Sequence, residues 1–380
     1  MNGESRQSQH MEILSRLLIC GKEGIEESER RENIGKLRRE LRYAATLGES
    51  EFADFLELAN AHHVIVRALS VLQDVAKLEP TAWVADQQNL EGLKSKCDIA
   101  LANERGRIER AMGYLHSICE ALEGRGCRVA VIKSLDHWPD LGSDLDLYTT
   151  AEQRTVEQTM RESFDARCVE RSWGDRLANK WNFRVPGLPE LVEVHVRYLG
   201  QTGEHAELAR RVIERRIQKQ VDGREFRVAA PEERIVISAL QRVYRHFYYR
   251  LCDMIDTAAL LGLDQVNFIE LKGAAESSGI WEGVATYLCL IQNYIQSFGG
   301  SVSLPDAVRN AAQSPNSTVH FKADYLRVSK VTGAKLYSSQ LLSAGKHLDL
   351  RALLRLPLLP PLAISALVAH TLTGNDKGIW

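Results

Sequence analysis

Two aspartates occupy alternate positions of a small, apolar stretch, Gly142-Ser143-Asp144-Leu145-Asp146-Leu147. Because side chains alternate across a β-strand, Asp144 and Asp146 would share one face while the leucines enter the other. Two carboxylates held so close repel each other. A shared hard cation such as Mg²⁺, which binds through one or two carboxylates plus substrate phosphates, relieves that repulsion. The pair therefore indicates a metal-dependent phosphate site, although an exposed edge strand that merely carries two aspartates would show the same pattern.

A third acid follows in a segment with the same alternation, Leu191-Val192-Glu193-Val194-His195-Val196-Arg197. Glu193, His195 and Arg197 would share one face of this strand, and the three valines would line the core. Glu193 is thus the candidate that completes the acid set. A solvent-facing edge strand is the alternative for this segment taken alone.

A further element lies upstream, where Val131-Ile132-Lys133-Ser134 ends a predicted strand and nine residues (135–143) separate Ser134 from Asp144. A small residue after a strand, then an Asp-x-Asp pair, then an acid on a later strand resembles the DNA polymerase β-like nucleotidyltransferase superfamily. Within it, Ile132-Lys133-Ser134, Asp144-Leu145-Asp146-Leu147 and Glu193-Val194-His195, with the later segment around Arg250 and Asp256, resemble an uncharacterised bacterial nucleotidyltransferase family. The resemblance covers about residues 108–262.

The turn departs from the pattern that the resemblance implies. Ser134 stands where the closer family has glycine, and Lys133 stands where the wider superfamily has glycine. The carboxylate half of the motif therefore matches the family, whereas the phosphate-binding half does not match it fully.

The resemblance implies nucleotidyl transfer, in which an acceptor hydroxyl attacks the α-phosphate of a nucleoside triphosphate and pyrophosphate leaves. It implies that Asp144, Asp146 and Glu193 are the catalytic and metal-binding residues for Mg²⁺ or Mn²⁺, with ATP as the expected co-substrate. Ser134 would contact the β- and γ-phosphates, and Lys133 would neutralise them.

The roles of His195 and Arg250 in the matched region each have two interpretations. His195 either bonds the acceptor or a phosphate, or orients Glu193. Arg250 is a candidate nucleotide-binding residue at the end of a basic stripe with helical spacing, which either grips an anion or faces solvent. The stripe consists of Arg242, Arg245, His246 and Arg250. For a second basic cluster, interleaved with glutamates, a solvated helix is the expected structure. That cluster consists of Arg210, Arg211, Arg215, Arg216 and Lys219.

Composition sets the frame for this chemistry. The chain has 380 residues, 44% of them hydrophobic and 26% charged, with a net charge of −2, so we expect a globular protein without a global attraction for nucleic acid or membranes. The seven cysteines are odd in number and show no Cys-x-x-Cys spacing, which favours a reducing cytoplasm over a disulfide framework. The first residues are polar, and no secretory signal is expected.

Hydrophobic periodicity predicts how these residues are positioned. We expect an α+β fold in which a small mixed β-sheet nucleotidyltransferase core is flanked by all-helical N-terminal and C-terminal regions. The expected domains are 1–125, 126–203 and 204–380. The expected core elements are strands over 127–132, 145–149, 166–171, 181–185 and 191–198, and a helix over 151–164 capped by Thr150. We expect a break in the N-terminal helical pattern at Pro80. We also expect a pair of helices over 232–263, which would carry Tyr248 and Tyr249. The apolar tail 350–372 contains three prolines, so we expect a buried or interfacial helix and no membrane span.

Two functions of different classes follow. The first is an enzyme that transfers a nucleoside monophosphate from a nucleoside triphosphate to a hydroxyl of a small molecule, a protein or an RNA end. The second is a catalytically weakened nucleotide-binding sensor or interaction module, which the altered Lys133-Ser134 turn favours and the three acids oppose. A long nucleic-acid template is not expected, because only local basic patches could contact phosphates. The acceptor, the base and the oligomeric state do not follow from the sequence.

Overall fold

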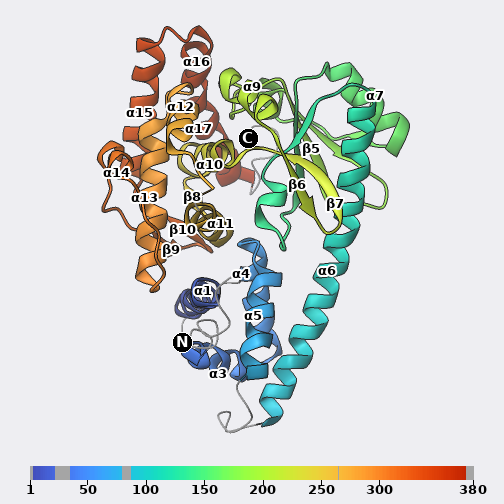
Figure 1. Ribbon diagram of the computed structural model, residues 1–380, viewed down its shortest axis with the longest axis vertical. Helices are drawn as coiled ribbons and strands as arrows, with labels where there is room; N and C mark the ends of the chain where they lie inside the picture. Colours follow the sequence, from blue (N-terminus) through green and yellow to red (C-terminus); the bar gives the residue numbers. More distant parts are fainter. Residues whose placement is uncertain (1–2, 22–34, 79–86, 264, 374–380) are drawn as a thin grey trace.

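The computed structural model describes residues 3–21, 35–78, 87–263 and 265–373. Within them the chain forms a mixed β-sheet flanked by helices on its N-terminal and C-terminal sides, which confirms the predicted α+β class (Figure 1). The predicted break at Pro80 lies outside the described residues.

The N-terminal helices pack together below the sheet, and one long helix joins them to it (Figure 1). Helix α6, 38 residues long, contacts α3 and α5 near its start and β1, β7 and α7 near its end. Buried apolar residues at helical spacing, such as Ile108, Ala111, Met112 and Leu115, explain this continuous contact. The helices are α1 (Gly3–Cys20), α3 (Arg38–Thr46), α4 (Glu49–Ala61), α5 (Ile65–Leu78) and α6 (Gln87–Gly124).

The sheet has seven strands within the described residues, in the order β3-β4-β5-β2-β1-β7-β6. β2 pairs with β5, and β1 with β7, in parallel; the other neighbours are antiparallel. The strands are β1 (Val129–Val131), β2 (Asp144–Thr149), β3 (Arg167–Cys168), β4 (Lys180–Arg184), β5 (Leu191–Val196), β6 (Ile217–Val221) and β7 (Arg224–Val228). The chain between β1 and β2 contains the short 3-10 turn η2 (Ser134–His137).

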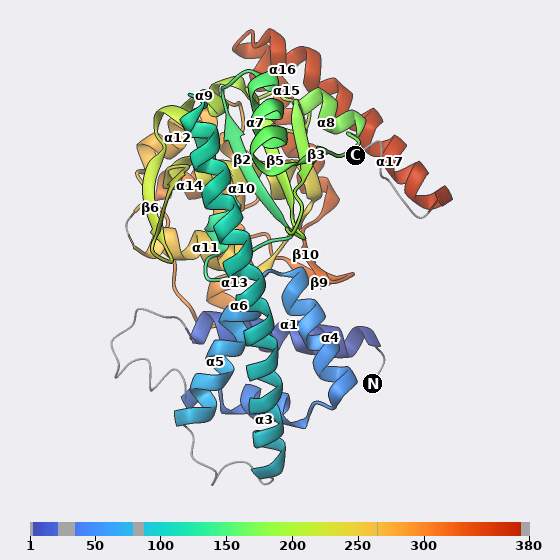
Figure 2. The same ribbon diagram turned by 90° about the vertical axis from the view of Figure 1, so that its right-hand side faces the viewer.

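The two faces of β2 and β5 differ as the alternation predicts. Leu145, Leu147 and the valines of β5 are fully buried, and the helices α6 and α7 (Gln153–Phe164) lie over one face of the sheet (Figure 2). The acids occupy the opposite face of the same strands. Neither strand is the solvent-facing edge strand that was the alternative for each motif, because both lie inside the sheet.

Several elements differ from their predicted bounds. Helix α7 begins after Glu152, whose side chain makes no capping bond, so the predicted cap at Thr150 is wrong. The third strand is reduced to Arg167–Cys168. The sheet also continues beyond residue 203, because the β6–β7 hairpin joins it through the parallel pair of Val131 with Val228. The division into three domains stays a prediction.

The C-terminal region is mainly helical, but it contains a second, three-stranded sheet within the described residues, in the order β8-β10-β9. Its strands are β8 (Tyr248–Tyr249), β9 (His320–Lys322) and β10 (Tyr325–Arg327). The prediction that Tyr248 and Tyr249 lie on a helix is therefore wrong. Phe247 adopts a left-handed backbone conformation (φ 55°) that ends the preceding helix, and the two tyrosines then pair with β10.

The helices of this region surround one side of the sheet (Figure 1). They are α9 (Ala206–Glu214), α10 (Pro231–Ala239), the π-helical η3 (Leu240–His246), α11 (Leu251–Gly262), α12 (Phe268–Glu276), α13 (Trp281–Ser297), α14 (Asp306–Ala311), α15 (Lys330–Lys346), α16 (Leu350–Arg355), η4 (Leu356–Leu358) and α17 (Leu359–Thr373). The short helix α8 (Trp173–Ala178) belongs to the core, where it connects β3 with β4. Helix α17 projects from the body, with Ile364 and Val368 more than half exposed (Figure 2). Among the described residues, no helix has the length and apolar character needed to cross a membrane.

A buried ion-pair network fastens the N-terminal helices to the rest of the fold. Arg67 of α5 donates from Nε to Asp140 Oδ2 (2.8 Å) and from Nη1 to Asp256 Oδ1 of α11 (2.5 Å). Asp140, in the chain that leads into β2, also accepts the backbone N–H of Val66 (2.6 Å). One guanidinium therefore joins three segments that are distant in sequence.

We expect Arg67→Met to lower the free energy of unfolding by about 3 kcal/mol, because it leaves the buried Asp140 carboxylate without a cation and removes one of the partners of Asp256. Denaturant titration of the whole chain measures this change. Arg105→Met is the matched control, since exposed Arg105 contacts only Ser70 in the described residues (3.3 Å) and its loss should cost less than about 0.5 kcal/mol. Equal effects of the two substitutions would contradict the proposed fastening role.

Candidate active site

The three predicted acids converge on one face of the sheet. Asp146 of β2 and Glu193 of β5 are direct partners in the parallel register, and His195 lies two residues further along β5. One ligand atom each of Asp146, Glu193 and His195 lies within 4.8 Å of the other two. Asp144, two residues before Asp146, lines a cavity together with Asp146 and Glu193. The fold thus brings Asp146 and Glu193 into one ligand cluster with His195 and places Asp144 on the same cavity wall, outside that cluster.

The pKa of Asp144 reflects the closeness of these acids. Burial, followed by the neighbouring charges of Asp146 and Glu193, raises its pKa from 3.8 to about 6. The only side-chain hydrogen bond found for it among the described residues comes from Ser143 Oγ (3.3 Å). Asp144 is therefore a carboxylate whose ionised form lacks a strong cationic partner, which is the condition that a bound cation relieves.

Two lysines approach the acids from different elements. Lys133 Nζ forms an ion pair with Asp146 and lies 3.7 Å from Glu193 Oε1. Lys180 Nζ, at the start of β4, lies 3.0 Å from Glu193 Oε2 and 2.8 Å from Asp175. Although burial alone would raise the pKa of Glu193, Lys180 and Lys133 hold it well below its usual range. Glu193 is therefore ionised at neutral pH.

His195 binds the acids instead of standing apart from them. Its Nε2 lies 2.8 Å from Glu193 Oε1 and 3.8 Å from Asp146 Oδ1. Its Nδ1 is buried and has no hydrogen-bond partner among the described residues. The contact with Glu193 fits the orienting role that was one of the two interpretations of this residue, and Nε2 also remains close enough to act as a ligand.

The Lys133-Ser134 turn has a definite geometry. Lys133 adopts φ 65° and ψ −58°, and Ser134 N–H donates to the carbonyl oxygen of Ile132 (2.7 Å), which makes a tight γ-turn. This positive φ favours glycine, the residue that the superfamily pattern has there. The lysine is thus held in a strained conformation that directs its ammonium group to the acids.

Ser134 is engaged in a different contact from the predicted one. Its Oγ accepts the backbone N–H of Asp146 (2.7 Å) and donates to the carbonyl oxygen of Asp144 (3.2 Å). The hydroxyl ties the turn to β2, and Ser134 still lines the cavity. A phosphate contact by this hydroxyl stays a prediction.

The basic stripe lines the same cavity as the acids. Arg242, Arg245 and His246 of the π-helical η3 line the cavity together with Arg250, which caps α11, and Tyr248. Arg242 forms an ion pair with Asp253 (2.5 Å). The Nε atoms of Arg242, Arg245 and Arg250 are all buried without a hydrogen-bond partner among the described residues. A widened helical turn is frequent at functional sites, and here it carries the cavity-lining cations.

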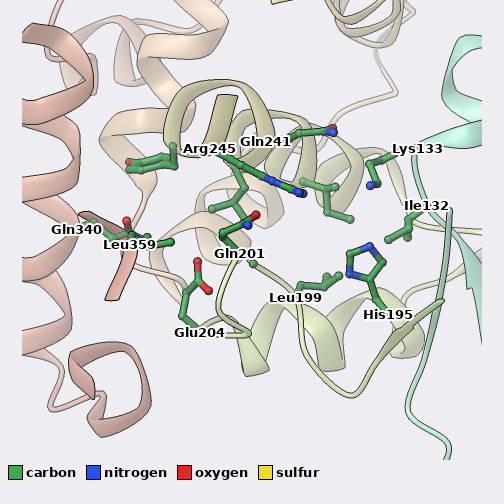
Figure 3. A pocket seen from close by; sticks show the side chains of 14 residues that line it. Ile132, Lys133, His195, Leu199, Gln201, Glu204, Gln241, Arg245, Gln340 and Leu359 are labelled. Carbon is green, nitrogen blue, oxygen red and sulfur yellow. The ribbon is translucent and has the colours of Figure 1, made fainter. Parts of the chain in front are cut away.

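One polar cavity is lined by both the acids and the basic stripe. It encloses about 240 Å³ of accessible space. A second, smaller and mainly apolar pocket of about 60 Å³ adjoins it and shares Lys133, Gln241 and Arg245 with it. Figure 3 shows His195 and Lys133 on one side of that pocket, and Gln340 and Leu359 on the opposite side.

Some site residues escaped the sequence interpretation. No local pattern in the sequence identifies Lys180 as a site residue, because only the antiparallel register of β4 with β5 places it opposite His195. Tyr249 is fully buried beside Tyr287, which leaves Tyr248 as the tyrosine of this pair on the cavity wall. The second basic cluster is only partly the solvated helix that was expected, because α9 ends at Glu214 and Arg211 pairs with the fully buried Glu233 of α10 (3.0 Å).

Comparisons with known proteins add little to this picture. No protein-family model matches the chain, and no curated protein matches it in sequence. Among solved structures, the antibiotic-resistance factor ANT(2'')-Ia shares 15% identity over 45% of this chain and 93% of its own, with a TM-score of 0.33. An antigenic nucleotidyltransferase-like protein from Paracoccidioides brasiliensis shares 16% identity over 53% of this chain and 97% of its own, also with a TM-score of 0.33. Similarity this low does not assign the chain to a family.

We expect Asp144→Asn to stabilise the metal-free protein above about pH 6. A carboxyl whose pKa is raised in the folded state costs stability as pH rises from 3.8 to about 6, because the unfolded chain ionises first. Melting temperatures of the wild type and the variant, measured from pH 4 to pH 8 with a chelator present, should therefore diverge as the pH rises. Adding Mg²⁺ should reduce the difference, since a cation offsets the repulsion. Parallel pH profiles would rule out this description of Asp144.

Proposed function

We propose that the protein is a metal-dependent nucleotidyltransferase that moves a nucleoside monophosphate from a nucleoside triphosphate to an acceptor hydroxyl and releases pyrophosphate. The observation that carries the proposal is the in-register pairing of β2 and β5, which gathers Asp144, Asp146 and Glu193 on the wall of one polar cavity. Arg242, Arg245 and Arg250 line the same cavity.

Asp144, Asp146 and Glu193 are the residues that would hold Mg²⁺ or Mn²⁺. Their oxygen donors suit a hard cation. The raised pKa of Asp144 and the ion pairs of Lys133 and Lys180 with the acids indicate that positive charge is stabilising at this place. When bound, such ions neutralise charge that develops on the phosphate during in-line displacement. Glu193, ionised and oriented by His195, is the group placed to accept the proton of the acceptor hydroxyl.

The remaining cavity residues supply the nucleotide contacts of this proposal. Arg245 and Arg250 carry guanidinium groups suited to phosphate oxygens, and Lys133 adds a point charge beside the acids. Tyr248 offers a ring on which a base can stack. ATP is the expected nucleotide.

The adjoining apolar pocket supports a small acceptor. It meets the nucleotide cavity at Lys133, Gln241 and Arg245, and His195 lines it, so a molecule bound there would lie beside the acid cluster. Leu199, Leu240 and Tyr244 give it a mainly apolar wall. A protein side chain or an RNA end would have to enter through the same pocket.

A second candidate is a nucleotide-binding module with weakened catalysis. Lys133 and Lys180 neutralise part of the acid cluster, and the Ser134 hydroxyl bonds the β2 backbone. If these lysines supply the positive charge in place of a metal ion, the site would bind a nucleotide without turning it over.

We expect Asp146→Asn to lower pyrophosphate release by about 100-fold or more, because the substitution removes a charge that the metal needs. The assay incubates the full chain with each nucleoside triphosphate and Mg²⁺ or Mn²⁺. Glu225→Gln, on the exposed side of β7, is the control that should leave the rate unchanged. Tight nucleotide binding with no turnover in the wild type would favour the second candidate.

We expect Arg250→Met to weaken nucleoside triphosphate binding by about tenfold while changing nucleoside binding little, because the guanidinium group would contact phosphate. Calorimetric titration with both ligands makes the comparison. Arg227→Met, on the exposed face of β7, is the matched control. An equal loss for both ligands would argue against a phosphate contact.

A further inference from the structure

A second cluster of ligating side chains lies on the wall of the same cavity. His63 lies between α4 and α5, His137 ends η2, and Cys252 lies in the first turn of α11. One ligand atom from each lies within 4.8 Å of the other two. None of these three residues has a part in the proposed nucleotidyl transfer.

The distances resemble those of a tetrahedral metal centre. Cys252 Sγ lies 3.8 Å from His137 Nε2. Zinc bonds of about 2.3 Å to sulfur and 2.05 Å to nitrogen at a tetrahedral angle place these two atoms about 3.6 Å apart. The pair is therefore close to ligand spacing without any rearrangement of the backbone.

The surroundings orient the His137 ring. Asp256 Oδ2 accepts a hydrogen bond from His137 Nδ1 (2.6 Å), which leaves Nε2 directed at the thiol. Arg67 holds the same carboxylate through its other oxygen (2.5 Å). A carboxylate that fixes the far nitrogen of a ligating histidine is the usual support of a zinc ligand.

His63 completes the donor set. Its ring packs against Gly142, where a Cβ atom would come within 3.0 Å of it. Its Nδ1 is buried without a hydrogen-bond partner in the described part of the chain. This nitrogen has no competing partner there and is available to a metal.

Cys252, His137 and Asp256 also form a thiol–imidazole–carboxylate chain of the kind that serves nucleophilic catalysis. Cys252 is fully buried, however, and the lining of the cavity includes His63 and His137 but not the thiol. Substrate atoms therefore meet the two imidazoles and cannot reach the sulfur. An ion bridging the three side chains needs no such access for the sulfur.

We propose that His63, His137 and Cys252 bind one transition-metal ion of the Zn²⁺ class, separate from the hard cation of the acid cluster. Thiolate and imidazole donors select such an ion over Mg²⁺. Binding takes the thiol proton into solution and links the N-terminal helices, the η2 turn and α11. Because the two histidines line the cavity, the ion's remaining coordination position faces water or a ligand there. The inference does not depend on the proposed transferase activity.

The test uses the full chain, stripped by a chelator under reducing conditions and titrated with Co²⁺ as a spectroscopic probe without nucleotide. We expect one Co²⁺ per chain, with a thiolate-to-cobalt band in the near ultraviolet and intense visible bands of tetrahedral geometry. One equivalent of Zn²⁺ should displace it and raise the melting temperature. Absence of these bands in the folded wild-type protein would overturn the proposal.

Variants assign the ligands. Cys252→Ser should abolish the thiolate band, and His63→Gln, a change on the cavity wall, should weaken Co²⁺ binding at least tenfold even if the buried serine variant fails to fold. Cys97→Ser, another buried cysteine, is the matched control that should keep the band. Loss of the band in Cys97→Ser, or its persistence in folded Cys252→Ser, would place the metal elsewhere and overturn the assignment.

Discussion

Crowding of negative charge between two parallel strands is the constraint on which the rest of the site depends. The register of β2 with β5 sets Asp146 beside Glu193, and the alternation of β2 adds Asp144 on the same face. Carboxylates brought together in a mostly enclosed place are costly unless cations accompany them. Lys133 and Lys180 meet that requirement from two other elements. The site is thus built to hold positive charge.

The scaffold around the acids restricts their movement. The γ-turn at Lys133 is fixed by the Ser134 hydroxyl, which bonds the backbone of β2 on both sides of Leu145. A strained φ at a charged residue persists only where its surroundings hold it. Apolar packing beneath β2 and β5, under α6 and α7, leaves the acid face as the side on which chemistry can occur.

The cavity is formed jointly by all three parts of the chain. The sheet supplies the acids, η3 and α11 supply the cations, and the segment between α4 and α5 closes the wall with His63. Its neighbour His62 accepts the backbone N–H of Leu251 at Nδ1 (2.8 Å), and Arg67 bonds Asp256. The N-terminal helices therefore take part in the architecture of the site and are not a separate appendage.

The sequence by itself determined the features that depend on local periodicity: the α+β class, the strands that carry the acids, and the shared face of Asp144 and Asp146, since alternation is a property of the strand. Only the tertiary structure decided the contacts that depend on register and chain reversal. Lys180 meets Glu193 through strand pairing, and Tyr248 leaves the predicted helix because β10 supplies its backbone partners. His63, His137 and Cys252 meet because packing joins three distant segments, which no local pattern records.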